Sequence, residues 1–89
     1  MTSVTLTLSD KRVLVVEDES AILMLIEDML GNFGEPHVLP AQSLSAGMKL
    51  AGKAELDLAL LDVNLAGEES YPIAARLRDR RVPFLFVTG

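Results

Sequence analysis

The chain has 89 residues, an apolar content of 49% and a formal net charge of −5 at pH 7. This length supports one domain, and the apolar content supplies a packed core, which excludes a disordered segment. The acidic balance excludes nonspecific nucleic-acid binding by this segment, and the lack of cysteine excludes disulfides and thiolate metal sites.

The N-terminal residues, 1–10, are rich in Thr and Ser, and we expect a flexible lead-in to a domain that spans 11–89. They lack the basic flank and the long apolar core of a signal peptide. The longest unbroken apolar stretch, 21–26, is too short to span a membrane. We therefore expect a cytoplasmic protein that does not contact a membrane.

The first predicted strand, 12–16, contains the apolar run Val-Leu-Val-Val. A helix should follow, because apolar residues recur at helical spacing from Ile22 to Phe33. Ser20 is the expected N-cap of this helix, and Gly34 is the expected residue just after its end.

The middle of the chain predicts a short strand at 37–39 and a second helix, capped by Ser43 or Ser45. Gly52 and Lys53 should end that helix. The apolar run 58–61 then predicts a third buried strand.

After a loop at 63–69, a third helix is predicted from 71 to 80, with Ser70 as its N-cap and Pro72 in its first turn. The apolar run 84–87 predicts the fourth strand.

Strands that are apolar throughout and alternate with helices predict an α/β fold, a flavodoxin-like doubly wound parallel sheet. The second strand carries His37 and is the weakest of the four, which fits an edge. The strand order should therefore be 2-1-3-4, with the switch point between strands one and three.

Acidic residues follow both strands at that switch point. Glu17 and Asp18 come directly after the first strand, and Asp62 follows the third. Ligands of open α/β sheets bind at the carboxyl ends of the strands, so these side chains should share one pocket. Three like charges repel unless a cation holds them, and we expect a hard divalent metal ion there. Thr88 takes the corresponding position after the fourth strand.

This set of motifs resembles the receiver domain of two-component response regulators. The resemblance rests on Val13-Leu14-Val15-Val16-Glu17-Asp18, on Leu61-Asp62 followed by Leu65-Ala66-Gly67, and on Val87-Thr88-Gly89. It covers the chain from about residue 11 to residue 89, and it implies two-component signal transduction with a phosphorylated, magnesium-binding receiver.

The resemblance also implies a role for each site residue. Asp62 would be the phosphoacceptor and would take its phosphoryl group from a sensor histidine kinase or a phosphotransfer protein. Asp18 and Asp62 would bind the metal through their side chains, Glu17 directly or through water, and Asn64 through its backbone carbonyl. Thr88 would be the switch hydroxyl that moves toward the phosphoryl group.

The chain departs from the family pattern in the residues around the site. Glu17 stands where Asp is commoner, Ala66 where Pro is common, and Glu69-Ser70 where an acid and a glycine are usual.

The family also has a helix, a strand and a helix after its fourth strand, which would need about 30 more residues. We therefore expect a receiver that lacks this last helix-strand-helix and its phosphoryl-contacting lysine. The lysines of the chain are Lys11, Lys49 and Lys53, none of which should reach the pocket.

Three functions stay open at this point. The first is a receiver that accepts a phosphoryl group on Asp62. The second is a truncated, non-phosphorylatable receiver that acts as an interaction or dimerisation module and self-associates through the uncharged strand 84–87. The third is a Mg²⁺-dependent phosphatase, for which the chain has no obvious room for a substrate-covering cap, so we do not expect an enzyme.

Overall fold

The computed structural model of the chain describes residues 7–87, and a four-stranded parallel sheet forms its centre. The strands are β1 (Arg12–Val16), β2 (His37–Ala41), β3 (Leu58–Asp62) and β6 (Phe84–Val87). Their order is β2-β1-β3-β6, which confirms the predicted order 2-1-3-4.

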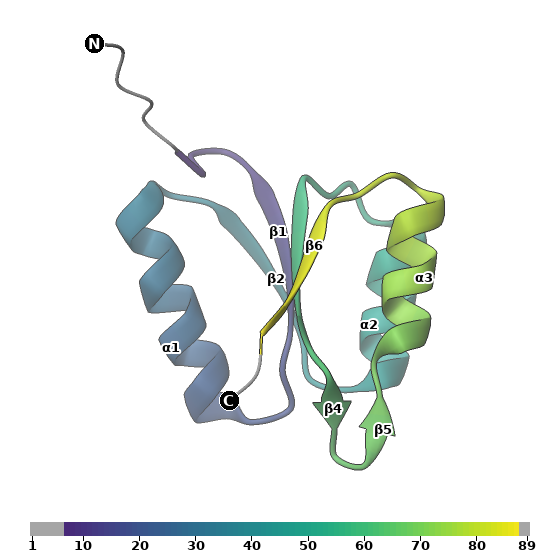
Figure 1. The fold of residues 1–89 in the computed structure, drawn as a ribbon. Helices are drawn as coiled ribbons and strands as arrows, with labels where there is room; N and C mark the ends of the chain where they lie inside the picture. Colours follow the sequence, from purple (N-terminus) through teal and green to yellow (C-terminus); the bar gives the residue numbers. More distant parts are fainter. Residues whose placement is uncertain (1–6, 88–89) are drawn as a thin grey trace, which may run out of the picture.

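Helices cover both faces of this sheet, as Figure 1 shows. On one face lies α1 (Ser20–Leu30), which continues into the short 3₁₀ helix η1 (Gly31–Phe33). On the other face lie α2 (Leu44–Lys53) and α3 (Tyr71–Asp79), side by side. The predicted doubly wound α/β fold is therefore confirmed. Among residues 7–87, no helix is long and apolar enough to cross a membrane.

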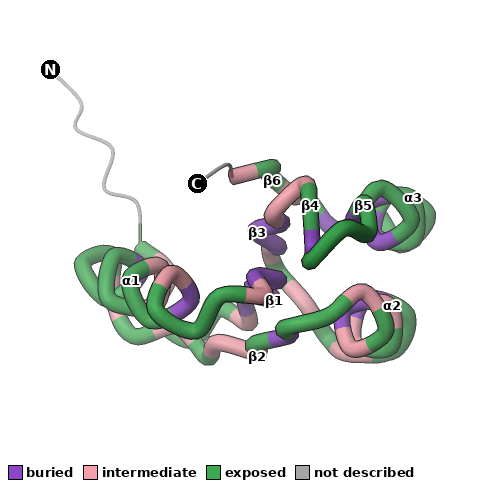
Figure 2. The backbone as a smooth tube through the Cα atoms, turned by 90° about the horizontal axis from the view of Figure 1, so that it is seen from below, coloured by how far each residue is buried: buried purple, intermediate pink, exposed green. Residues whose placement is uncertain are grey.

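The core forms two layers because side chains alternate along β1. Leu14 and Val16 point to the α2–α3 face and join a cluster that includes Ile73 of α3. Val13 and Val15 point to the other face and join a cluster with Leu23 of α1. Figure 2 shows buried residues along β1 and β3, at the centre of the molecule. The two central strands are thus fixed from both sides, which holds the ends of these strands in place.

The helix α2 lies close to the sheet and to α3 because Gly47 has no side chain. A Cβ at this position would collide with the Cδ1 atom of Ile73. Two arginines also donate hydrogen bonds to carbonyls of α2: Arg76 of α3 to Met48 at 3.4 Å, and Arg80, which directly follows α3, to Ala51 at 2.8 Å. The pair α2–α3 therefore forms one packed unit on its face of the sheet.

The observed N-caps of the helices agree only in part with those predicted from the sequence. Ser43 caps α2 as predicted, since its hydroxyl accepts a hydrogen bond from the Ala46 N–H at 3.1 Å. The N-cap of α1 is Glu19 rather than Ser20, and no side chain caps this helix. Ser70 occupies the N-cap position of α3 as predicted, but its side chain accepts no capping hydrogen bond.

The strand β2 runs two residues further than predicted, through Pro40 to Ala41. It lies at an edge of the sheet, where a proline without an N–H is tolerated. His37, at the start of β2, is exposed, as suits an edge strand.

The predicted loop after β3 contains a small hairpin that the sequence analysis missed. Its strands are β4 (Asn64–Leu65) and β5 (Glu68–Glu69), paired antiparallel. Ala66 and Gly67 form the turn with φ values of 53° and 93°. Positive φ at both central residues is the pattern of a type I′ turn, which suits the twist of a tight hairpin.

Leu8, in the predicted lead-in, packs against the cluster beneath α1, and its N–H donates to the Phe33 carbonyl at 2.7 Å. Part of the predicted lead-in is therefore packed against the folded domain.

Candidate functional site

The acidic residues lie where β1 and β3 end side by side. Val16, the last residue of β1, is in register with Leu61 of β3. Glu17 and Asp18 follow at the end of one strand, and Asp62 is the last residue of the other. The parallel pairing of two central strands therefore brings together residues that are far apart in the sequence.

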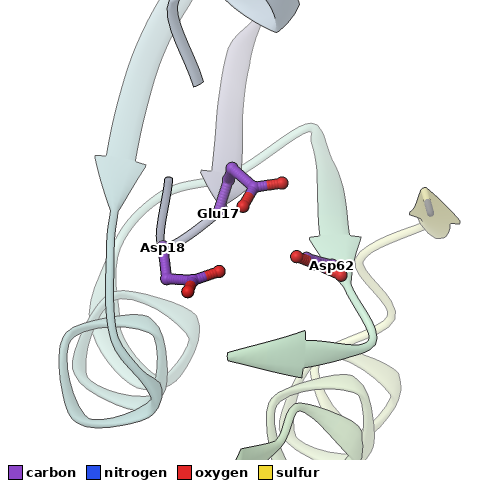
Figure 3. Close-up of side chains that lie close together, drawn as sticks. All are labelled: Glu17, Asp18 and Asp62. Carbon is purple, nitrogen blue, oxygen red and sulfur yellow. The ribbon is translucent and has the colours of Figure 1, made fainter. Parts of the chain in front are cut away.

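The three carboxylates converge on one space, as Figure 3 shows. Each offers an oxygen atom, and these atoms all lie within 4.8 Å of one another. Among residues 7–87, no lysine or arginine forms an ion pair with them. The negative charge of this cluster is therefore not neutralised by the protein groups described.

Glu17 is the buried member of the cluster, with only 3% of its surface exposed. Its Oε2 atom accepts a hydrogen bond from the Glu19 N–H at 3.1 Å, which orients the carboxylate and favours its charged form. Burial raises the pKa of Glu17 above its ordinary value, and the neighbouring charges of Asp62 and Asp18 raise it further. The site therefore holds one carboxylate for which a cation would be an especially favourable neighbour.

Asp62 is oriented by the hairpin that follows it. Its Oδ1 atom accepts a hydrogen bond from the Asn64 N–H at 3.3 Å. The Asn64 side chain is held in turn, because its Oδ1 accepts from the Gly67 N–H at 2.8 Å. The hairpin thus connects the position of Asp62 to the turn at Gly67.

The backbone carbonyl of Asn64 takes no part in the hydrogen bonds between β4 and β5. The Ser70 N–H donates to the Val63 carbonyl at 2.9 Å, and the next pair along the hairpin is Asn64 with Glu69. Hydrogen-bonded and non-hydrogen-bonded pairs alternate in antiparallel strands, so the Asn64–Glu69 pair is a non-hydrogen-bonded one. The carbonyl oxygen of Asn64, two residues after Asp62, is therefore not hydrogen-bonded within the hairpin.

The other predicted residues lie elsewhere. Thr88 falls outside the residues that the structure describes. Lys11 immediately precedes β1, at the opposite end of the strand from Glu17, while Lys49 and Lys53 lie on α2.

Sequence reasoning missed the hairpin that orients Asp62, because Gly67 was its only clear signal. It also missed the environment of Ser70, which is fully buried and whose hydroxyl has no hydrogen-bond partner.

The oxygen atoms of this cluster determine which ligands it can bind. Three carboxylates and one free backbone carbonyl are hard oxygen ligands, which suit Mg²⁺, Mn²⁺ or Ca²⁺ rather than a soft metal. A partly exposed carboxylate at the rim of such a site is also a nucleophile that can meet an anionic substrate once the charge is neutralised.

Comparisons with known proteins agree with the fold. Residues 13–89 match the family model of the response regulator receiver domain. Regulatory protein VanR of Enterococcus faecium is 34% identical over 83 residues, which cover 92% of this chain and 35% of VanR. Virulence sensor protein BvgS of Bordetella pertussis is 36% identical over 67 residues, 75% of this chain and 5% of BvgS. The chain thus spans about a third or less of the length of these relatives.

Solved structures show the same likeness. A CheY-like receiver domain protein from Methanospirillum hungatei superposes with a TM-score of 0.78 at 29% identity, over 91% of this chain and 66% of that protein. TrrA of Thermotoga maritima, a response regulator solved in complex with Mg²⁺–BeF, gives 0.77 at 26% identity, over 88% and 69%. Together with the family match over most of its length, these findings establish that the chain belongs to the response regulator receiver domain family.

Proposed function

We propose that this chain accepts a phosphoryl group on Asp62 in a reaction that depends on Mg²⁺ or Mn²⁺. The observation that carries the proposal is the convergence of three carboxylates, within 4.8 Å of one another, at the ends of β1 and β3. Phosphoryl acceptance is the general function of the family to which the chain belongs.

In the proposed reaction, an oxygen of Asp62 attacks the phosphorus atom of a phosphohistidine. The new O–P bond makes an acyl phosphate, while the P–N bond breaks and the histidine nitrogen leaves with the electron pair. The Asn64 N–H holds the other carboxylate oxygen, so Asp62 keeps one orientation during the attack. The donor would be a sensor histidine kinase or a phosphotransfer protein, which would place this step in the cytoplasm.

The residues present fit a divalent cation. Glu17, Asp18, Asp62 and the backbone carbonyl of Asn64 would hold it, and Glu17 is a buried carboxylate without a cationic partner among the described residues. When bound, the cation neutralises the charge that would otherwise repel the incoming phosphoryl group. The Mg²⁺–BeF complex of TrrA supports the same type of site here.

Thr88 follows β6, the strand beside β3, and we propose that it is the switch hydroxyl. This role would couple phosphorylation of Asp62 to β6. The lysines lie before β1 or on α2, so no lysine in residues 7–87 is available at the pocket to oppose the developing phosphoryl charge. We therefore expect slow phosphorylation, since losing one such contact costs on the order of 10²–10³ in rate.

The test is labelling by a small donor. The chain is incubated with acetyl phosphate, with Mg²⁺ or with EDTA, and its intact mass is followed over time. We expect one phosphoryl group to be added slowly and only with Mg²⁺. Asp62→Asn should abolish labelling, whereas Glu69→Gln, which removes one exposed charge from the neighbouring hairpin, should keep it. Equal labelling of Asp62→Asn and the unmodified chain would exclude Asp62 as the acceptor.

A second function is favoured by a separate observation, the exposure of Leu85 and Phe86 on β6. Two large apolar side chains on one exposed strand suit an interaction module that binds a partner or a second copy, with or without phosphorylation.

A further inference from the structure

We propose that the side chain of Asn64 is a positioning residue of the carboxylate site. Its Oδ1 atom accepts a hydrogen bond from the Gly67 N–H at 2.8 Å, and this contact fixes the backbone carbonyl of Asn64 that would bind the divalent cation. The role rests on the proposed function, because it concerns the same site. It adds a determinant of cation affinity that lies outside the three carboxylates.

The hairpin β4–β5 projects from the carboxyl end of the sheet, directly after Asp62 (Figure 1). One of its faces is held by Leu65, which is buried in the core cluster on the α2–α3 side of the sheet. Side chains alternate along a strand, so Asn64, the residue before Leu65, lies on the opposite face, where it is exposed. Asn64 is therefore free to contact the turn rather than the core.

The backbone of Asn64 faces the carboxylate site. Its N–H donates to Oδ1 of Asp62 at 3.3 Å, so this edge of β4 is turned toward Asp62. The N–H and the C=O of one strand residue point to the same edge, which is why a hydrogen-bonded antiparallel pair exchanges both bonds. The Asn64 carbonyl, which takes no part in the hydrogen bonds with β5, therefore lies on the same edge as the Asp62 carboxylate.

The hairpin is too small to hold this edge by its ladder alone. Its two pairs are Asn64 with Glu69 and Leu65 with Glu68, and only the second is a hydrogen-bonded pair. A short two-stranded ribbon is at best marginally stable in water. The contact between Asn64 and Gly67 is therefore a large part of the polar interactions that define the hairpin.

The turn explains why the contact falls on Gly67. Ala66 and Gly67 lie between the two strands, with φ values of 53° and 93°. The first value is unfavourable for a residue with a Cβ atom. The Gly67 N–H lies outside the ladder pairs of the hairpin, and Oδ1 of Asn64 is its acceptor. The side chain thus closes a second ring across the turn and fixes the turn relative to the Asn64 backbone.

A positioning role differs from a purely stabilising one in what it changes. If Asn64 only stabilised the hairpin, its loss would lower the free energy of unfolding but leave the dissociation constant of the folded chain for Mg²⁺ unchanged. If Asn64 positions the carbonyl, the dissociation constant itself rises. Groups that orient metal ligands typically contribute about 10–100-fold to metal affinity. We expect the lower end of this range, because the carbonyl is neutral and is one ligand among several.

The test replaces Asn64 by leucine, which is similar in size but cannot accept a hydrogen bond from the Gly67 N–H. Mg²⁺ alone, without a phosphodonor, is titrated into the unmodified chain and into Asn64→Leu, and binding is followed by the amide NMR shifts of the folded chain. We expect the dissociation constant to rise about tenfold. The Gly67 amide should also exchange faster with solvent. Because both readouts come from the folded population, a general loss of stability does not produce them.

Asn64→Asp is the conservative variant, since a carboxylate oxygen can still accept from the Gly67 N–H. It should bind Mg²⁺ at least as tightly as the unmodified chain. Glu69→Gln removes one exposed carboxylate from the residue paired with Asn64, so it measures the effect of one nearby charge alone. Its effect on the dissociation constant should be much smaller than that of Asn64→Leu.

Gly67→Ala changes the other partner of the contact. An added Cβ would meet no atom within 4 Å, so the substitution touches nothing in the site, but an alanine is strained at this positive φ. The variant should also weaken Mg²⁺ binding. Combining it with Asn64→Leu should add little further weakening, because both changes disrupt the same contact.

The outcomes separate this role from the proposed function. If the unmodified chain does not bind Mg²⁺, the proposed function and the role of Asn64 both fail. If the unmodified chain binds Mg²⁺ and Asn64→Leu binds it with the same dissociation constant, only the role of Asn64 is refuted. The same holds if Asn64→Asp weakens binding as much as Asn64→Leu, or if the effects of Asn64→Leu and Gly67→Ala add in full.

Discussion

Replacing Asp62 by asparagine tests the carboxylate cluster most directly. The variant removes one of three negative charges but keeps the side-chain shape, and its Oδ1 atom can still accept the Asn64 N–H. We expect two opposite effects on the free energy of unfolding. Without metal, the variant should be more stable than the unmodified chain, because like-charge repulsion is relieved. With Mg²⁺, it should gain less stability, because one ligand charge is lost.

The size of the first effect follows from the separation of the oxygens. For charges within 4.8 Å of one another, Coulomb's law gives about 3.5 kcal/mol per pair at an effective dielectric constant of 20, and about 0.9 kcal/mol in bulk water. Asp18 and Asp62 are partly exposed, so the lower figure is closer to their situation. Asp62 takes part in two such pairs, with Asp18 and with Glu17. We therefore expect a gain of about 1–2 kcal/mol, which raises the melting temperature of a domain this small by about 4–16 °C.

The assay is urea and thermal unfolding at pH 7, in EDTA and in excess Mg²⁺. A cation that binds only the folded chain adds about 2.7 kcal/mol at a concentration 100 times its dissociation constant. Glu69→Gln is the matched control, since Glu69 is exposed on β5 and is not one of the three clustered carboxylates. It should change neither the metal-free stability nor the response to Mg²⁺ by more than a few tenths of a kcal/mol.

The reasoning would be refuted by one combined result: Mg²⁺ leaves the stability of the unmodified chain unchanged, and Asp62→Asn unfolds at the same urea concentration as Glu69→Gln. The three carboxylates would then be solvated acids whose proximity has no energetic consequence.

Two further predictions concern neighbouring residues. Burial raises the pKa of Glu17 in the folded chain above its unfolded value, so metal-free stability should fall as pH rises from about 4.3 through that raised pKa. Glu17→Gln should lack this loss of stability. Its free energy of unfolding should match that of the unmodified chain at low pH and exceed it at pH 7. If the two chains lose stability in parallel as the pH rises in EDTA, the prediction is wrong. Ala66 has a φ of 53° in the hairpin turn, and Ala66→Asn should raise the free energy of unfolding by about 0.5–1 kcal/mol, because Asn-Gly is a favoured type I′ pair. A lower urea midpoint for Ala66→Asn would contradict the expectation that a better type I′ turn stabilises the fold.

Sequence patterns predicted the sheet well because its strands are simple. The run Val13-Leu14-Val15-Val16 and the run 58–61 are apolar on both faces, as expected of strands in a parallel sheet that helices cover on both sides. Together with right-handed crossovers and the weaker second strand placed at an edge, this pattern predicted the order of the strands and put the acids at the carboxyl ends of two neighbouring strands. The closeness of Glu17, Asp18 and Asp62 therefore followed from topology, without any knowledge of side-chain contacts.

The hairpin after Asp62 could not be predicted in the same way. Its strands have two residues each, too few to show alternation, and its turn has Ala66 where hairpin sequences usually have Asn or Asp. The extension of β2 through Pro40 was missed because proline argues against a strand unless the strand is known to lie at an edge. Both misses concern features that depend on tertiary context.

The position of β1 between β2 and β3 links the carboxylate site to the folding pathway. Glu17 and Asp62 are about half the chain apart, and they meet only after β1 and β3 have paired in register. A folding intermediate in which β1 has paired only with β2 contains no such site. A divalent ion would therefore accelerate refolding only if the β1–β3 pairing precedes the rate-limiting barrier, and would otherwise act by slowing unfolding. The metal dependence of the two arms of a chevron plot would thus report when the two central strands meet.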